Sequence, residues 1–168
     1  MKKIFITLAL IIFGHILYGQ NIGQLKAGYI YQFTNYVEWP GSYQSGDFVI
    51  SLFGDAEVYQ HLQDVANSKK VQNQKIQVNK YSSLSQIGKS HIIFISKGNS
   101  NQLSSVLNHV QGNNTLVISE KKGLAKQGSD MAFFISGGKL QFNLNKSAIN
   151  KHGLKLDPRL ESLASSVY

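Results

Sequence analysis

Two apolar runs without alternation constrain the fold of this chain more than any other feature. They are Ile92 to Ile95 and Leu116 to Ile118. A strand with one solvated face alternates apolar and polar residues, whereas a strand covered on both faces reads as a continuous apolar run. Strands of this kind are typical of parallel sheets whose crossovers are helices. We therefore predict a sheet that is partly parallel and lies between layers of helices.

The segments around these runs follow a β-α-β order. Phe48 to Phe53 is a further buried strand, ending at Gly54, and Ile76 and Val78 mark a weaker one. Asp55 is expected to cap the helix that follows. Apolar residues at steps of three and four predict two amphipathic helices. These residues are Val58, Leu62, Val65 and Ala66 in the first helix, and Leu103, Val106, Leu107 and Val110 in the second.

The pattern changes after Glu120, where a polar loop begins. Two strands follow, Met131 to Ile135 and Leu140 to Leu144, and the glycine pair between them predicts a hairpin. The chain is thus expected to form one α/β layered domain. Its mixed sheet, a parallel part followed by a C-terminal antiparallel hairpin, is flanked by helices.

Helices are also predicted at both ends of this domain. An aromatic amphipathic helix begins at Ile22, carries its apolar stripe to Val37 and stops at Trp39-Pro40, because proline cannot continue a helix. The last amphipathic helix opens at Asp157-Pro158 and extends to Val167.

The first nineteen residues have the layout of a secretory signal peptide. Lys2 and Lys3 precede an apolar run from Ile4 to Leu17, which is short for a membrane-spanning helix. We expect cleavage near Gly19 or Gln20; the alternative is an uncleaved N-terminal anchor. This divides the chain into a signal peptide at residues 1–19 and one domain at residues 20–168, with a periplasmic location.

The charge of the chain argues against a nucleic-acid partner. Without Lys2 and Lys3 the chain carries 15 basic and nine acidic residues, a net charge of +6. Arg159 is the only arginine, and the lysines are scattered rather than clustered into a stripe. Nucleic-acid-binding proteins depend on arginine and on clustered positive charge, so we predict no nucleic-acid binding.

The residues also lack an arrangement typical of catalysis or metal binding. His61, His91, His109 and His152 share no metal-ligand spacing. The chain has no Gly-x-Ser-x-Gly turn, and its few acidic residues offer no convincing pair of catalytic carboxylates. We predict no catalytic residue, no cofactor and no metal, and expect a protein that is not an enzyme.

Several segments together resemble the YfiR family of exported regulatory proteins. The segment from Lys26 to Pro40 is similar to the opening helix of that family, with a lysine, spaced aromatic residues and a terminal Trp-Pro. Similar segments follow in the same order over nearly the whole remaining chain. They are Gly54-Asp55, His91 to Ile95, Leu116 to Ser119, Met131 to Ile135, Leu140 to Asn145, Ala148, Gly153-Leu154 and Leu160 to Ala164.

This resemblance implies a periplasmic regulator without enzymatic activity. The best-known member restrains a membrane-bound diguanylate cyclase through its periplasmic portion, and so acts in cyclic-di-GMP signalling. An outer-membrane lipoprotein releases that member, which tends to form a homodimer. The chain departs from the pattern in two respects: it has no cysteine, which excludes thiol-based sensing, and Asn143 replaces an acidic residue near the end. The partner expected here is a membrane signalling protein of the diguanylate cyclase or sensor kinase type.

Two groups of residues are candidates for binding. Tyr36, Trp39 and Pro40 could form an exposed apolar patch for a partner protein; the alternative is that Trp39 is a core residue or closes the end of the helix. Lys26 is assigned no role beyond solubility.

Asp55, Lys97 and Lys121 follow predicted parallel strands, whose carboxyl ends commonly form a ligand crevice. They could line a small polar pocket for an anion, or simply belong to ordinary loops. A pocket of this kind would favour a second function, that of a periplasmic small-molecule-binding module that feeds a receptor.

Overall fold

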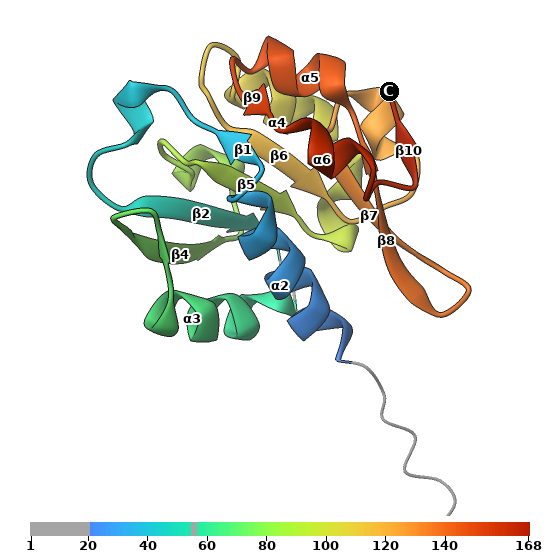
Figure 1. Cartoon of the computed structure of the whole chain (residues 1–168), viewed down its shortest axis with the longest axis horizontal. Helices are drawn as coiled ribbons and strands as arrows, with labels where there is room; N and C mark the ends of the chain where they lie inside the picture. The colour runs from blue at the N-terminus through green and yellow to red at the C-terminus, as the bar shows by residue number, and fades with distance from the viewer. Residues whose placement is uncertain (1–20, 55–56) are drawn as a thin grey trace, which may run out of the picture.

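A computed structural model describes residues 21–54 and 57–168 of the chain (Figure 1). Its main sheet has eight strands in the order β10-β8-β7-β6-β5-β2-β4-β3, and a two-stranded sheet pairs β1 with β9. The strands are β1 (Val37–Glu38), β2 (Phe48–Phe53), β3 (Lys70–Val71), β4 (Gln74–Tyr81), β5 (Ile92–Ile95), β6 (Leu116–Ser119), β7 (Met131–Ser136), β8 (Lys139–Leu144), β9 (Lys155–Leu156) and β10 (Ser166–Val167). The helices are α2 (Ile22–Phe33), α3 (Val58–Ser68), α4 (Leu103–His109), α5 (Lys146–Lys151) and α6 (Pro158–Glu161), with 3-10 turns η2 (Gly41–Tyr43), η3 (Leu84–Gln86), η4 (Lys97–Gln102) and η5 (Leu124–Gln127).

The sheet is mixed, as the sequence predicts. β4, β2, β5, β6 and β7 run parallel in that spatial order, and β7 and β8 form the antiparallel hairpin. Gly137 and Gly138 at the turn have φ values of +56° and +73°. Positive φ at both central residues is the requirement of a type I′ turn, whose twist matches that of the strands. The hairpin projects from the body of the domain (Figure 1).

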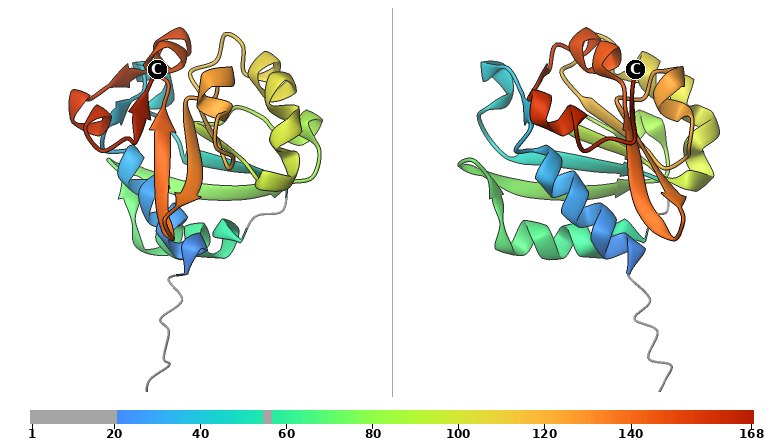
Figure 2. Two further views of the ribbon diagram at one scale, coloured as in Figure 1. Left: turned by 90° about the vertical axis from the view of Figure 1, so that its right-hand side faces the viewer. Right: turned by 45° about the vertical axis from the view of Figure 1, so that its right-hand side comes forward.

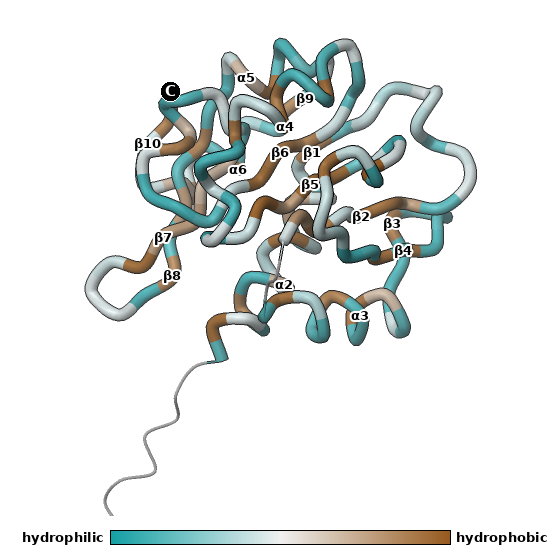
Figure 3. The backbone as a smooth tube through the Cα atoms, turned by 180° about the vertical axis from the view of Figure 1, so that it is seen from behind, coloured by the Kyte–Doolittle hydropathy of each residue, from teal (hydrophilic) through white to brown (hydrophobic). Residues whose placement is uncertain are grey.

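Helices cover both faces of the central strands. On one face Ile92, Phe94, Leu116 and Ile118 pack in the same core as α2 and α3. On the other face the intervening strand residues, such as Val117, pack against α4 and η5. Figure 2 gives two further views of these layers, and Figure 3 shows that β5 and β6 are coloured as hydrophobic segments. Burial on both faces explains why the apolar runs do not alternate.

The first helix is shorter than predicted. α2 begins after Asn21, whose side chain accepts a hydrogen bond from the backbone N–H of Gln24, and it ends at Phe33 rather than near Val37. The backbone carbonyl of Tyr36 accepts a hydrogen bond from the N–H of Asp157, and Val37 pairs with Leu156 in the small sheet. These contacts with the C-terminal part of the chain replace helical hydrogen bonds, although the apolar spacing continues past Phe33.

The last helix is also shorter than predicted. Asp157 caps α6 and Pro158 occupies its first turn, as expected, but the helix ends at Glu161. The N–H groups of Ser165 and Tyr168 donate to carbonyl groups of β8, so the terminal residues form the edge strand β10. The apolar residues at helical spacing therefore do not share a buried face: Leu163 is 58% exposed and Val167 is 40% exposed.

Within the described residues, no helix combines the length and the apolar character needed to cross a membrane. The predicted signal peptide lies outside this part of the chain, because residues 1–20 are not described.

Candidate functional site

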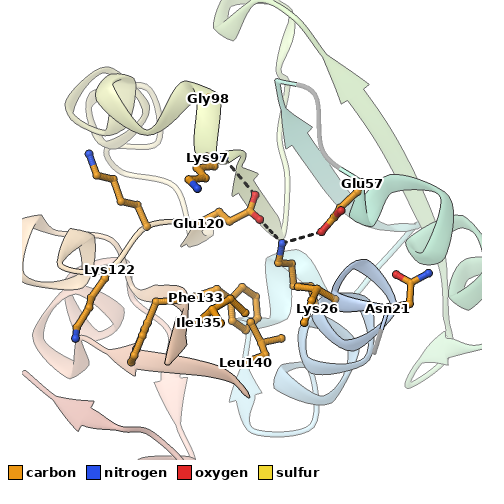
Figure 4. Close-up of a pocket in the computed structure, with 13 residues that line it drawn as sticks. Asn21, Lys26, Glu57, Lys97, Gly98, Glu120, Lys122, Phe133, Ile135 and Leu140 are labelled. Carbon is orange, nitrogen blue, oxygen red and sulfur yellow. Dashed lines mark hydrogen bonds and ion pairs between the residues drawn. The ribbon is translucent and has the colours of Figure 1, made fainter. Parts of the chain in front are cut away.

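A cleft of about 890 Å³ opens at the carboxyl ends of β5 and β6 (Figure 4). The N-terminal end of α2, the loop before α3, the start of η4 and the hairpin strands surround it. Lys97 and Lys121, which were expected to line a polar pocket, both line it. Asp55, the third residue predicted to line this pocket, lies outside the described residues. The lining consists of Asn21, Ile22, Lys26, Glu57, Lys97, Gly98, Glu120, Lys121, Lys122, Phe133, Phe134, Ile135 and Leu140.

Lys26 lies in this cleft as a buried cation rather than a solubilising surface residue. Its side chain is 7% exposed, and its Nζ lies 3.2 Å from Oε1 of Glu57. The same Nζ also forms an ion pair with Oε1 of Glu120. A buried ammonium group is costly unless it is paired, so the two carboxylates compensate for its desolvation.

The expectation that Lys26 contributes only to solubility is therefore wrong. Lys26 stands four residues after Ile22 and four before Ile30, on the face of α2 that packs against the sheet. Its position on this apolar stripe is consistent with burial, but the sequence alone does not identify the partners that make burial of a lysine favourable. Its partners Glu57 and Glu120 are 31 and 94 residues away in the sequence, and neither stands out in the primary structure.

Glu120 joins three elements at the base of the cleft. It directly follows β6, and its side chain is 18% exposed. One carboxylate oxygen contacts Lys26 of α2, and the other accepts a hydrogen bond of 3.2 Å from the backbone N–H of Lys97 in η4. The exposed carboxylate of Glu57, just before α3, completes the network. Both acidic groups of the cleft are thus engaged with Lys26.

The opposite wall of the cleft is apolar and belongs to the hairpin. Phe133, Phe134, Ile135 and Leu140 line it. Phe133 and Leu140 are buried, Phe134 is half-buried, and Ile135 is 52% exposed. The ammonium group of Lys122 lies 5.2 Å from the centroid of the Phe134 ring. The cleft therefore has a polar side, with Lys26, Glu57 and Glu120, and an apolar side, with Phe133, Ile135 and Leu140, as Figure 4 shows.

Trp39 is a core residue and does not form an exposed patch. It is 5% exposed, and its Nε1–H donates a hydrogen bond of 3.2 Å to the backbone carbonyl of His91. Its ring packs edge-on against Phe48, with a centroid distance of 5.0 Å. Tyr36 and Pro40 are half-buried. The prediction that Tyr36, Trp39 and Pro40 form an exposed patch is wrong for Trp39. This residue follows strand β1 and packs into the core instead of ending a surface helix.

Tyr36 does, however, lie at a shallow pocket of about 160 Å³ with Leu163. Leu163 is 58% exposed and Tyr36 is half-buried. The guanidinium of Arg159 lies 5.6 Å from the centroid of the Tyr36 ring. An apolar surface therefore exists beside α2, but its exposed residue comes from the C-terminal segment.

The histidines of the core are held by hydrogen bonds. His91 accepts at Nδ1 from the N–H of Val49, at 3.0 Å, and its Nε2 lies 2.7 Å from the carbonyl oxygen of Tyr43. Burial lowers the pKa of His91, so the neutral ring is favoured. His152 contacts the carboxylate of Asp130, which is fully buried, and burial raises the pKa of this carboxyl group. In the described part of the chain, no three His, Cys, Asp or Glu residues are grouped so that they could hold a metal ion.

A comparison of the sequence with models of protein families shows which family the domain belongs to. The model of the YfiR/HmsC-like family matches residues 23–165. The chain belongs to this family. The match includes Lys26, Glu57, Glu120 and the hairpin, so the cleft is part of the YfiR/HmsC-like domain. No curated protein matches the chain significantly.

Two solved structures share the fold of this YfiR/HmsC-like chain. A conserved domain protein from Vibrio cholerae O1 biovar El Tor has a TM-score of 0.62 and 10% identity, and the alignment covers 87% of this chain and 60% of that one. The ABC domain in complex with L-Trp from Streptococcus pneumoniae has a TM-score of 0.53 and 9% identity, with 71% and 55% covered. The chain thus spans little more than half the length of each, and the similarity concerns the fold alone.

The segment that resembles the YfiR family has two structural tasks in this domain. Its lysine, Lys26, holds the carboxylates at the base of the cleft, and its Trp39 closes the opposite end of the core against Phe48. Pro40 directly precedes η2, which places the carbonyl of Tyr43 beside the ring of His91. The segment from Lys26 to Pro40 therefore stabilises the base of the cleft through Lys26 and the core through Trp39.

Proposed function

We propose that this protein is a periplasmic regulator that binds the periplasmic portion of a membrane signalling protein. The partner would be of the diguanylate cyclase or sensor kinase type, and binding would hold it in its inactive population. The observation that supports this function is the match of the YfiR/HmsC-like family over residues 23–165. The first nineteen residues would direct export and be removed near Gly19 or Gln20.

Regulation would occur by stoichiometric binding rather than by catalysis. The two carboxylates of the cleft, on Glu57 and Glu120, are both paired with Lys26. Among the described residues lining the cleft there is no nucleophile hydrogen-bonded to a general base, which is the arrangement that covalent catalysis requires. These contacts favour a binding protein. A homodimer and an outer-membrane lipoprotein that releases it are further parts of the proposal.

The surface around Tyr36 and Leu163 is the proposed contact with the membrane partner. It retains Tyr36 from the sequence-based hypothesis and replaces the buried Trp39 by an exposed leucine. An exposed leucine, Leu163, beside the ring of Tyr36 and the guanidinium of Arg159 has the composition of a protein-binding surface. Pro40 does not line this pocket and is not included in the proposed surface.

Capture of envelope proteins tests the proposal. The tagged protein, expressed in its own host, is used to isolate crosslinked membrane proteins, and a cyclase or sensor kinase is expected among them. Leu163→Ser should reduce its recovery at least fivefold. Ile135→Ser removes a side chain of similar exposure at the cleft and should leave recovery unchanged. Recovery of no signalling protein, or equal loss in both variants, would contradict the proposed surface or the proposed partner.

The cleft supports a second candidate function, that of a small-molecule-binding module feeding a receptor. Its volume lies within the range of about 300–1,000 Å³ that is usual for ligand sites. The Streptococcus pneumoniae structure with a similar fold is an ABC domain in complex with L-Trp. Calorimetry of the purified protein with a panel of metabolites tests this function, and neither heat nor a melting shift with any of them would reject it.

A further inference from the structure

The cations on the rim of the cleft have no acidic partner among the described residues. Lys97, Lys121 and Lys122 are exposed, and none forms an ion pair with a described residue. The two carboxylates of the lining are already engaged by Lys26. Among the described residues of the lining, four lysines and two glutamates give a net charge of +2. The rim therefore offers unpaired positive charge to a ligand.

The apolar wall adds a second requirement. Ile135 is 52% exposed beside the half-buried Phe134, on the side of the cleft formed by the hairpin. A small inorganic anion could satisfy the lysines but would leave this wall in contact with water. A neutral apolar molecule would cover the wall but leave the lysines unpaired. The occupant that matches both sides carries an anionic group on an apolar body.

We propose that the cleft binds an anionic amphiphile, in which a phosphate or carboxylate group is attached to an alkyl chain. The anion would lie against Lys97 and Lys121, and the chain would lie along Phe134 and Ile135. A zwitterion is less suitable, because its cationic group would face a cleft of net positive charge. This inference rests on the second candidate function, ligand binding, and names the class of ligand for it.

The apolar wall should govern affinity. Each buried methylene group is expected to increase affinity about fourfold, so burial of two or more of them should exceed a tenfold gain over the bare anion. The lysines should govern the choice between an anion and an alcohol with the same chain. Their effect should be weakened by salt, because exposed charges are screened.

Isothermal titration calorimetry of the purified protein tests the proposal with five probes. These are octyl phosphate, octanoate, 1-octanol, inorganic phosphate and acetate, all below their micellar concentrations. At least one octyl anion should bind at least tenfold more tightly than its headgroup alone and than 1-octanol. The difference between octyl phosphate and octanoate identifies the preferred anionic group.

Variants place the binding in the cleft. Lys97→Gln/Lys121→Gln should weaken the octyl anion about tenfold and leave 1-octanol unaffected, and Ile135→Ser should weaken it about threefold to tenfold. Lys69→Gln/Lys75→Gln removes the same charge beside and within the β3–β4 hairpin, away from the cleft, and should leave affinity within twofold. Thermal melts of every variant confirm that it is folded.

Three results would overturn the proposal. Equal affinity for phosphate and octyl phosphate would make the cleft a site for bare anions, and equal affinity for 1-octanol and the octyl anions would indicate nonspecific apolar binding. Binding of a different metabolite, with no octyl anion bound, would retain the ligand-binding function and reject this ligand class. Envelope capture is a separate measurement, so failure of the regulator proposal is distinguishable from each of these.

Discussion

Replacing Lys26 by methionine removes the cation that joins α2 to the end of β6. Methionine has a similar length and keeps the apolar contacts of the lysine stem, so the change isolates the charge. In the unsubstituted protein the side chain of Glu120 is 18% exposed, and the backbone N–H of Lys97 donates a hydrogen bond to it that does not depend on Lys26. Glu57 is 65% exposed and can return to water.

The expected loss of stability follows from these exposures. Breaking a fully buried ion pair costs about 3–5 kcal/mol, because one charge remains buried without a partner. Glu120 is partly exposed and keeps one donor, so we expect a cost of about 2–3 kcal/mol. The exposed pair with Glu57 adds at most about 1 kcal/mol. Together these contributions give a loss of about 2–4 kcal/mol, which for a domain of this size corresponds to a fall in Tm of about 4–16 °C.

Urea unfolding followed by circular dichroism measures this loss. Lys26→Met/Glu120→Gln should recover at least about 1 kcal/mol relative to Lys26→Met, because the unpaired carboxylate is gone. Lys151→Met removes an exposed helical lysine of α5 and should change stability by less than about 0.5 kcal/mol. A Lys26→Met variant as stable as the parent protein, or a double variant less stable than Lys26→Met, would refute the argument.

Substitutions at three further sites test the core and the end of β2. Trp39→Ala should lower stability by about 3–5 kcal/mol in thermal melts. Trp39→Phe should lower it by only about 1 kcal/mol, because phenylalanine loses the hydrogen bond to His91 but keeps a ring against Phe48. An unchanged melting temperature for Trp39→Ala would contradict the burial of Trp39. Burial lowers the pKa of His91 below its ordinary value of 6.5. As the pH falls, the unfolded state therefore binds a proton before the folded state does, and stability should decrease below about pH 6.5. His91→Gln should flatten this pH dependence in urea titrations at pH 7.5 and 5.5. Gly54→Ala should lower stability by at least about 1 kcal/mol, because Gly54 has a φ of +92° and an added Cβ would overlap the side chain of Asn99. Gly41→Ala is the control in the same melts, because an added Cβ at Gly41 meets open space.

The ends of the elements are where the sequence pattern misled. The spacing of Tyr36 and Val37 continues the stripe of α2, yet their backbone groups bond to Asp157 and Leu156 near the other end of the chain. Leu163 and Val167 likewise stand at helical spacing, but residues 165–168 add an edge strand to β8. Periodicity reports which side chains could share a face, whereas long-range backbone pairing decides where each helix ends.

Only two lysines of the candidate cleft, and not its apolar wall, were predicted from the sequence. Lys97 and Lys121 follow parallel strands, and parallel strands bring their carboxyl ends to one edge of a sheet, so these two lysines were expected to lie together. The apolar wall from the hairpin was not expected, because nothing local in Phe134 or Ile135 indicates that the hairpin lies beside that edge.

The residues of this chain determined, by themselves, a mixed sheet buried between helices, since continuous apolar strands and a glycine turn can be satisfied in few other ways. Tertiary structure alone decided that Lys26 is a buried ion-pair partner and that Trp39 belongs to the core. The physical reason is that burial depends on segments far apart in the sequence. Lys26 is stabilised in the interior because Glu57 and Glu120, 31 and 94 residues away, supply the opposite charge.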